Sequence, residues 1–265
     1  VESRKSIDMG TKHRNDKGRS VKATFCCPVC NSGIVKGDYI DSEASKGRMG
    51  VIPVAIVAEG AREKLYLPVE QQEISSLINV INEFYDKNML GQRVPHAECR
   101  GTFASNAQGR NYGFFEYKDY FTKRQLIALT TFSDLIKEVQ KKAEEDAVAA
   151  GMDSDDISLD QGGKGATAYG QAVGVYLSLV INKVADYNST LCSWHLSREI
   201  IGHTFARQAI PMVWDFAEAN VFSNSSGSWR NMLEWVVRCI PYFSAQKDAT
   251  AVQFDAQSDI GLRNI

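Results

Sequence analysis

The sequence predicts an α+β protein in which a small β-rich module is followed by a mainly helical region. β-Prone runs are concentrated in the first 69 residues, whereas from residue 70 onward apolar residues recur mostly at three- and four-residue spacing. A Cys-x-x-Cys sequence lies within the β-rich part. The chain has 265 residues, which suffices for one large domain or two small ones.

Composition narrows the class of protein. Hydrophobic residues make up 44% and charged residues 23%, as in ordinary globular proteins. The net charge of -2 argues against a surface that coats nucleic acid throughout, but it allows a local basic patch. No apolar run approaches the roughly 20 residues that cross a bilayer, and the N-terminus lacks the apolar stretch of a signal peptide. We therefore expect no membrane partner.

The six cysteines are thinly spread, unlike the dense framework of a small disulfide-linked secreted protein. This distribution favours a reducing, cytoplasmic setting. The sequence does not begin with Met, and we expect it to be a processed product or a piece of a longer protein.

The β-rich module is predicted over residues 1–69. "SVKATF" (20–25) alternates apolar and polar residues and leads into the cysteines. "VIPVAIVAEG" (51–60) and "KLYLPV" (64–69) are two further β-prone runs joined by a short turn. Together these runs predict three to five strands.

Residues 70–246 are predicted to be mainly helical. The first helix places six apolar or aromatic residues on one face, namely Ile74, Leu77, Ile78, Ile81, Phe84 and Tyr85. Further helices are predicted over 121–151, around the apolar stripe of 173–184, and over 229–240. Residues 91–120 indicate a long loop region, and long loops often carry function. Residues 152–165 form an acidic linker, and 206–220 are left open between helix and irregular structure.

Cys27 and Cys30 are the candidate metal ligands. Two thiolates at this spacing form one knuckle of a zinc ribbon, which needs four ligands in all. Cys99, Cys192 and Cys239 stand alone in the sequence, so this pair supplies half of a site. The alternatives are a redox pair, which the absence of a thioredoxin-like helix disfavours, and plain structural cysteines.

A basic stretch interleaved with aromatic residues is the candidate nucleic-acid surface. Its cations are Arg100, Arg110, Lys118, Lys123 and Arg124. Such a pattern suits contacts to phosphates, with an ordinary solvated face as the alternative. Trp194 is a candidate for stacking on a base, and a half-buried structural tryptophan is the alternative.

Several longer stretches carry a family resemblance. They are "ATFCCPVCNSG", "GRMGVIPVAIVAEG" (48–60), "HAECRGTFASNAQGRNYGF" (96–114), "FTKRQLIALTTFSDL" (121–135), "ADYNSTLCSWHLSREIIGHTFARQAIPMVWDFAEANVF" (185–222) and "ATAVQFDA" (249–256). In this order they resemble the central part of a bacterial and archaeal family of adenine-specific DNA methylases that contain a zinc ribbon. The resemblance runs from about residue 20 to residue 256.

The resemblance implies an S-adenosylmethionine-dependent methyltransferase with a Rossmann-like sheet. The family's Gly-rich cofactor loop lies upstream of the zinc ribbon and its catalytic Asp-Pro-Pro-Tyr sequence lies downstream, and neither occurs here. We therefore expect a fragment that holds no catalytic residue and is inactive alone, with the other zinc knuckle upstream. Residues 247–265 would be a returning strand of the sheet. Asp255 would contact the adenine amine of the cofactor, or else merely cap a strand or loop.

Two functions follow as expectations. The first is the zinc-ribbon and helical middle of an adenine N6-methyltransferase whose partners are DNA, with RNA as an alternative, and the remainder of the methyltransferase chain. Such families often lie beside restriction or anti-phage genes. The second is a free-standing zinc-binding adaptor for nucleic acid or protein, without catalysis.

Overall fold

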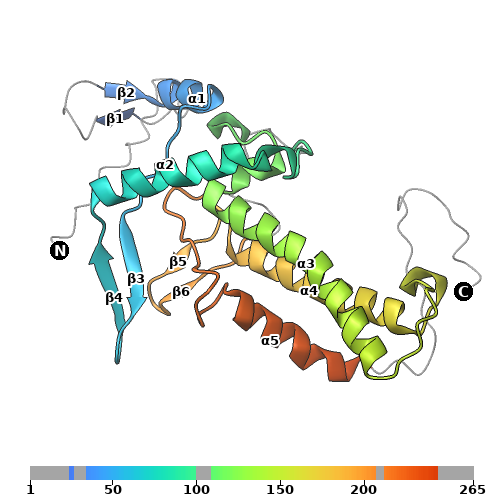
Figure 1. Ribbon diagram of the computed structural model, residues 1–265. Coiled ribbons are helices and arrows are strands. Elements are labelled where there is room, and N and C mark those ends of the chain that lie inside the picture. The colour runs from blue at the N-terminus through green and yellow to red at the C-terminus, as the bar shows by residue number, and fades with distance from the viewer. Residues whose placement is uncertain (1–23, 27–33, 100–108, 207–211, 244–265) are drawn as a thin grey trace, which may run out of the picture.

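The computed structural model is an α+β arrangement in which helices dominate (Figure 1). It describes residues 24–26, 34–99, 109–206 and 212–243. Within these ranges the strands form three separate two-stranded antiparallel sheets, and the helices lie mainly in the second half of the chain. The predicted α+β class is confirmed at this level. A Rossmann-like sheet or a zinc ribbon stays a prediction.

The first sheet pairs β1 (Thr24–Cys26) with β2 (Ile34–Lys36) in antiparallel register. Residues 27–33, which carry both candidate zinc ligands, connect these strands and lie outside the described residues. The zinc-ribbon knuckle at Cys27 and Cys30 stays a prediction.

A helix follows directly within the predicted β-rich module. α1 (Gly37–Ser45) was not expected from the sequence. Its segment offers few apolar side chains at helical spacing, so periodicity gave no signal. It separates the first sheet from the second along the chain, so residues 24–68 do not form one continuous sheet.

The second sheet pairs β3 (Ala55–Glu59) with β4 (Lys64–Pro68). Both strands fall inside the predicted β-prone runs. The connecting turn is closed by the Gly60 amide, which donates to the carbonyl of Glu63 over 3.0 Å. The two predicted β-prone runs are confirmed as strands, and the structure pairs them as a hairpin.

α2 (Gln71–Lys87) confirms the first predicted helix. Only part of its apolar face is buried. Ile74, Ile78 and Ile81 are half-buried. By contrast, Leu77 is 52% exposed and Phe84 is 48% exposed, so these two do not face the core.

The loop region contains short 3-10 helices at Leu90–Gln92, Arg110–Tyr112 and Tyr117–Tyr120. It leads into α3 (Lys123–Ala149), whose start is fixed by a reciprocal pair of hydrogen bonds. The Thr122 hydroxyl accepts from the Gln125 amide, while the Gln125 side chain accepts from the Thr122 amide. This capping box explains why the helix begins where it does.

α3 and α4 (Ala166–Tyr187) lie side by side as a helical hairpin (Figure 1). Their connection includes a 3-10 turn at Leu159–Gln161. The two backbones approach closely at Gly170, where an added Cβ would lie 2.7 Å from the carbonyl oxygen of Gln140. A residue without a side chain is therefore required at this crossing.

α5 (Trp229–Cys239) packs on α4 and completes the main core. Val180, Val184, Val221 and Met232 are its buried centre. The ring of Trp229 stacks on Phe132 of α3, with centroids 4.4 Å apart. The predicted apolar stripes over 173–184 and 229–240 are helical, and the structure brings them together in this core.

The third sheet is the short hairpin of β5 (Trp194–His195) and β6 (Ile200–Ile201). It follows α4, and residues 212–228 after it are irregular where described, apart from an isolated β-bridge at Phe216. Residues 247–265, the predicted returning strand, lie outside the described residues. No helix in the described part of the chain is long and apolar enough to span a membrane.

Candidate nucleic-acid interface

Five consecutive residues after α4, Asn188–Cys192, are buried although three of them are polar. The Asn188 amide donates to the carbonyl oxygens of Val184 and Gly227, each over 3.0 Å. These bonds join the end of α4 to the loop that precedes α5. The polar side chain is tolerated in the core because both donors of its amide are satisfied.

Thr190 fastens the same buried segment to the residues before α3. Its amide and its hydroxyl both donate to the carbonyl oxygen of Tyr120, over 2.7 Å and 2.9 Å. Leu191 packs beside Tyr120 and Cys99 in a second, smaller core. Burial raises the pKa of both Tyr120 and Cys99, so both groups remain protonated near neutral pH.

Asp186, in the last turn of α4, anchors the far end of the β5–β6 hairpin. Its backbone carbonyl accepts from the amide and the hydroxyl of Thr204, over 2.7 Å and 2.8 Å. Its carboxylate accepts from the Phe205 amide at 3.1 Å and lies 3.4 Å from Nδ1 of His203. The hairpin is therefore held at its base by one acidic residue.

The hairpin itself is braced by aromatic contacts. Trp194 meets Tyr66 of β4 edge-on, with centroids 6.4 Å apart, and its indole donates to the Tyr66 hydroxyl over 3.2 Å. Tyr66 in turn donates to Glu199 over 3.2 Å. Trp194 is half-buried between two hairpins, as the structural alternative supposed. Its stacking on a base stays a prediction.

Arg110 is placed against acidic and aromatic groups. Its Nη1 donates to Glu98 over 2.9 Å and to the carbonyl of Cys99 over 2.8 Å. The guanidinium also lies over the ring of Phe115, 5.6 Å from its centroid. These contacts hold the loop region in place. They leave only part of the Arg110 guanidinium available to contact a ligand.

Lys123 and Arg124 begin α3 and are also paired. The Lys123 ammonium lies 3.3 Å from Asp86 of α2 and 5.0 Å from the centroid of Tyr85. Arg124 contacts Glu218, with both Nε and Nη2 at 2.9 Å from Oε2. A phosphate at these residues would have to compete with a carboxylate already in place. Their role as phosphate contacts stays a prediction.

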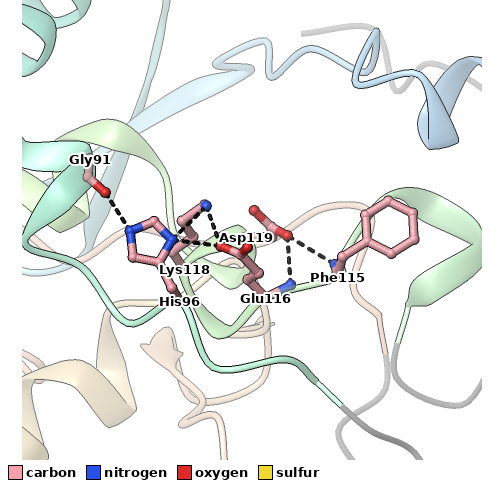
Figure 2. A network of polar contacts seen from close by, with 6 residues as sticks. All are labelled: Gly91, His96, Phe115, Glu116, Lys118 and Asp119. Atoms are coloured by element: carbon pink, nitrogen blue, oxygen red, sulfur yellow. Dashed lines mark hydrogen bonds and ion pairs between the residues drawn. The ribbon is translucent and has the colours of Figure 1, made fainter.

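A polar network that the sequence did not reveal lies beside them (Figure 2). Nε2 of His96 donates to the Gly91 carbonyl over 2.7 Å, and Nδ1 lies 2.9 Å from Glu116 and 3.1 Å from Lys118. The hydrogen bond from Lys118, then that from His96, lowers the pKa of Glu116. Lys118, a member of the predicted basic stretch, is thus already engaged by His96 and Glu116.

Asp119 closes the turn in this network. Its carboxylate accepts from the amides of Phe115 and Glu116, over 2.9 Å and 2.8 Å (Figure 2). The spacing of Glu116 and Asp119 matches a capping box with an acidic residue at its start, and this spacing is the signal that could have located the turn.

Four predicted site residues lie outside the described part of the chain: Cys27, Cys30, Arg100 and Asp255. Their metal, phosphate and cofactor roles stay predictions. Among the described residues, no group of three or more His, Cys, Asp or Glu side chains could hold a metal ion.

The chain was compared with known proteins. It matches no protein-family model, no curated protein and no solved structure. The chemistry and packing of its own residues, with the sequence resemblance, are therefore what points to a function.

Proposed function

We propose that this chain is the zinc-ribbon and helical part of an S-adenosylmethionine-dependent, adenine-specific DNA methyltransferase. It supplies contacts to DNA, and the remainder of the methyltransferase chain supplies the cofactor loop and the catalytic Asp-Pro-Pro-Tyr sequence. The reaction would act on a flipped adenine. The 265 residues alone would then be catalytically inactive.

One observation carries the proposal: the stretches that resemble the family meet in space. The Arg124 guanidinium pairs with Glu218, and the ring of Tyr112 meets that of Trp214 edge-on, with centroids 5.1 Å apart. These contacts join the stretches 121–135 and 96–114, respectively, to residues 185–222. Stretches that are distant in the sequence thus form one packed unit, which supports a shared role for them.

Zinc and S-adenosylmethionine are the implied cofactors. Cys27 and Cys30 would supply two zinc ligands on the β1–β2 connection, and bound zinc would hold that hairpin closed. Asp255 would orient the adenine of the cofactor, which supplies the methyl group. The residues concerned lie outside the described part of the chain, so no step is assigned to them.

The first test is the gene itself, read in both directions from these residues. A Gly-rich cofactor sequence upstream and Asp-Pro-Pro-Tyr downstream would support the methyltransferase. Stop codons close to both ends would overturn it in favour of the free-standing zinc-binding adaptor.

The second test is DNA binding by the purified chain, followed by the fluorescence anisotropy of a labelled duplex at several salt concentrations. We expect Lys123→Ala to weaken binding to all duplexes and to reduce the salt dependence by about one counterion. Lys142→Ala is the matched control, because Lys142 also lies on α3 and is also paired with an aspartate, Asp146. Equal effects of the two changes would remove Lys123 from the interface.

A further inference from the structure

The tip of the β5–β6 hairpin is an exposed part of the region that resembles the family. His195, Leu196, Ser197 and Arg198 are all exposed, and Leu196 is 79% exposed. Leu196 directly follows a residue of β5, so a large apolar side chain is presented to solvent at a sharp turn of the backbone. Burial of the Leu196 side chain against a partner would be favourable, because it would remove apolar surface from water.

Backbone contacts hold the base of the hairpin tip in place. The Gly202 amide donates to the Ser193 carbonyl over 2.7 Å, and Ser193 forms a β-bridge with Phe216. A Cβ at Gly202 would lie 2.5 Å from Nε2 of His195, so the imidazole closely covers this glycine. With Asp186 at the base, these contacts make the hairpin a rigid projection.

The backbone of the tip also adopts an uncommon conformation. Glu199 has φ +50°, in the left-handed region that a residue with a side chain seldom occupies. Its carboxylate accepts a hydrogen bond from Tyr66, which stabilises the strained turn. Strain held in place by surrounding contacts is found preferentially at binding and catalytic sites.

Arg198 is the exposed cation of the tip. Arg198 makes no ion pair within the described part of the chain, unlike Arg110 and Arg124. The acidic residue next to it, Glu199, is engaged by Tyr66. The tip therefore combines an exposed leucine, a histidine and a cation that has no ion pair among the described residues.

We propose that the β5–β6 hairpin is a wedge that inserts Leu196 into the base stack of duplex DNA. Arg198 contacts a phosphate beside the inserted leucine, and His195 covers Gly202 at the base of the tip. Apolar side chains that enter base steps in this way unstack and kink a duplex, and unstacking assists the extrusion of a base. The inference rests on the proposed DNA contact and adds the place and the manner of that contact.

The test uses the whole chain and a short duplex that carries 2-aminopurine at several positions, because the fluorescence of this base rises when it is unstacked. Anisotropy of an end label reports binding separately. We expect the chain to raise the 2-aminopurine signal. Leu196→Ala should abolish the rise while changing affinity by less than about threefold, because phosphate contacts dominate affinity. Arg198→Ala should weaken binding about fivefold and reduce its salt dependence.

Leu159→Ala is the matched control, since Leu159 is an exposed leucine (41%) in the connection between α3 and α4. It should leave both signals unchanged. A persistent 2-aminopurine rise in Leu196→Ala, with binding intact, would overturn the wedge but not the DNA contact. Absence of binding by the wild-type chain would overturn both, whereas stop codons flanking the gene segment would remove only the methyltransferase.

Discussion

Arg124 and Glu218, 94 residues apart in the sequence, meet in an ion pair in which two guanidinium nitrogens lie 2.9 Å from one carboxylate oxygen. The other oxygen, Oε1, is buried and has no hydrogen-bond partner among the described residues. Both side chains are less than one-third exposed. The pair therefore ties the first turn of α3 to the irregular segment before α5.

Glu218→Gln should lower the free energy of unfolding by about 1–3 kcal/mol, because it leaves the partly buried guanidinium without its counter-charge. Urea unfolding measures the change. Glu234→Gln is the control: Glu234 pairs with Arg238 on the exposed face of α5, and the loss there should be below about 0.5 kcal/mol. Similar losses in both variants would mean that the Arg124 pair contributes no more than a surface pair.

Asn188→Ala should destabilise the chain by about 1–3 kcal/mol, because two carbonyl oxygens in the core lose their donor. Asn88→Ala tests the same type of bond at the surface, where the Asn88 amide donates to the Phe84 carbonyl and water can replace it. Thermal unfolding of both variants compares them. A smaller loss at Asn188 than at Asn88 would contradict the role given to the buried segment.

Gly170→Ala should destabilise the helical hairpin, although alanine normally stabilises a helix by up to about 1 kcal/mol over glycine. The added methyl group would meet the backbone of α3 at Gln140, and the helices would separate at a cost of about 1–3 kcal/mol. Gly50→Ala, with no atom near its Cβ, should stay within about 0.5 kcal/mol. Stabilisation by Gly170→Ala in urea unfolding would refute the close crossing.

Stability should fall at alkaline pH. Burial, then the neighbouring Cys99, raises the pKa of Tyr120 above its ordinary value of 10.0, so the native state favours the neutral phenol. The contribution is fully present below pH 10, and it is lost above that pH because the unfolded chain releases its proton first. Tyr120→Phe should make the loss shallower, with the exposed Tyr242→Phe as the control. Equal slopes in urea unfolding between about pH 9 and pH 12 would contradict this assignment.

Elemental analysis should find zinc in the purified chain, and the Cys27→Ser/Cys30→Ser double variant should lose it. One zinc per chain would mean that Cys26, a distant Cys or His, or a second chain completes the four ligands. A folded chain without zinc would overturn self-sufficient zinc binding and leave the metal to a longer protein. Cys239→Ser tests whether this exposed thiol on α5 is the distant cysteine, and zinc retained in that variant would exclude it.

Local pattern was sufficient to predict most regular elements. The spacing of Val180 and Val184 predicted α4, and the β-prone runs around Gly60 predicted strands β3 and β4. These features depend on neighbours in the sequence, where period and turn chemistry act directly. α1 was missed because its few apolar residues give no helical period.

The candidate site was predicted only in part. The sequence indicated a basic, aromatic stretch, but it could not show that Arg110 is paired with Glu98 or Lys123 with Asp86. It likewise gave no sign that Leu196 projects from a braced turn, since a single leucine between polar residues carries no pattern. Such facts depend on which segments pack together.

By itself the sequence determined the helices other than α1, strands β3 and β4, the cysteine pair and the resemblance that suggests a methyltransferase. Only the tertiary structure decided that Asn188–Cys192 is buried, that Glu218 engages Arg124, and that Tyr66 braces the hairpin tip. The physical reason is distance along the chain. Periodicity and capping act over a few residues, whereas ion pairs and buried polar contacts join segments that only packing brings together.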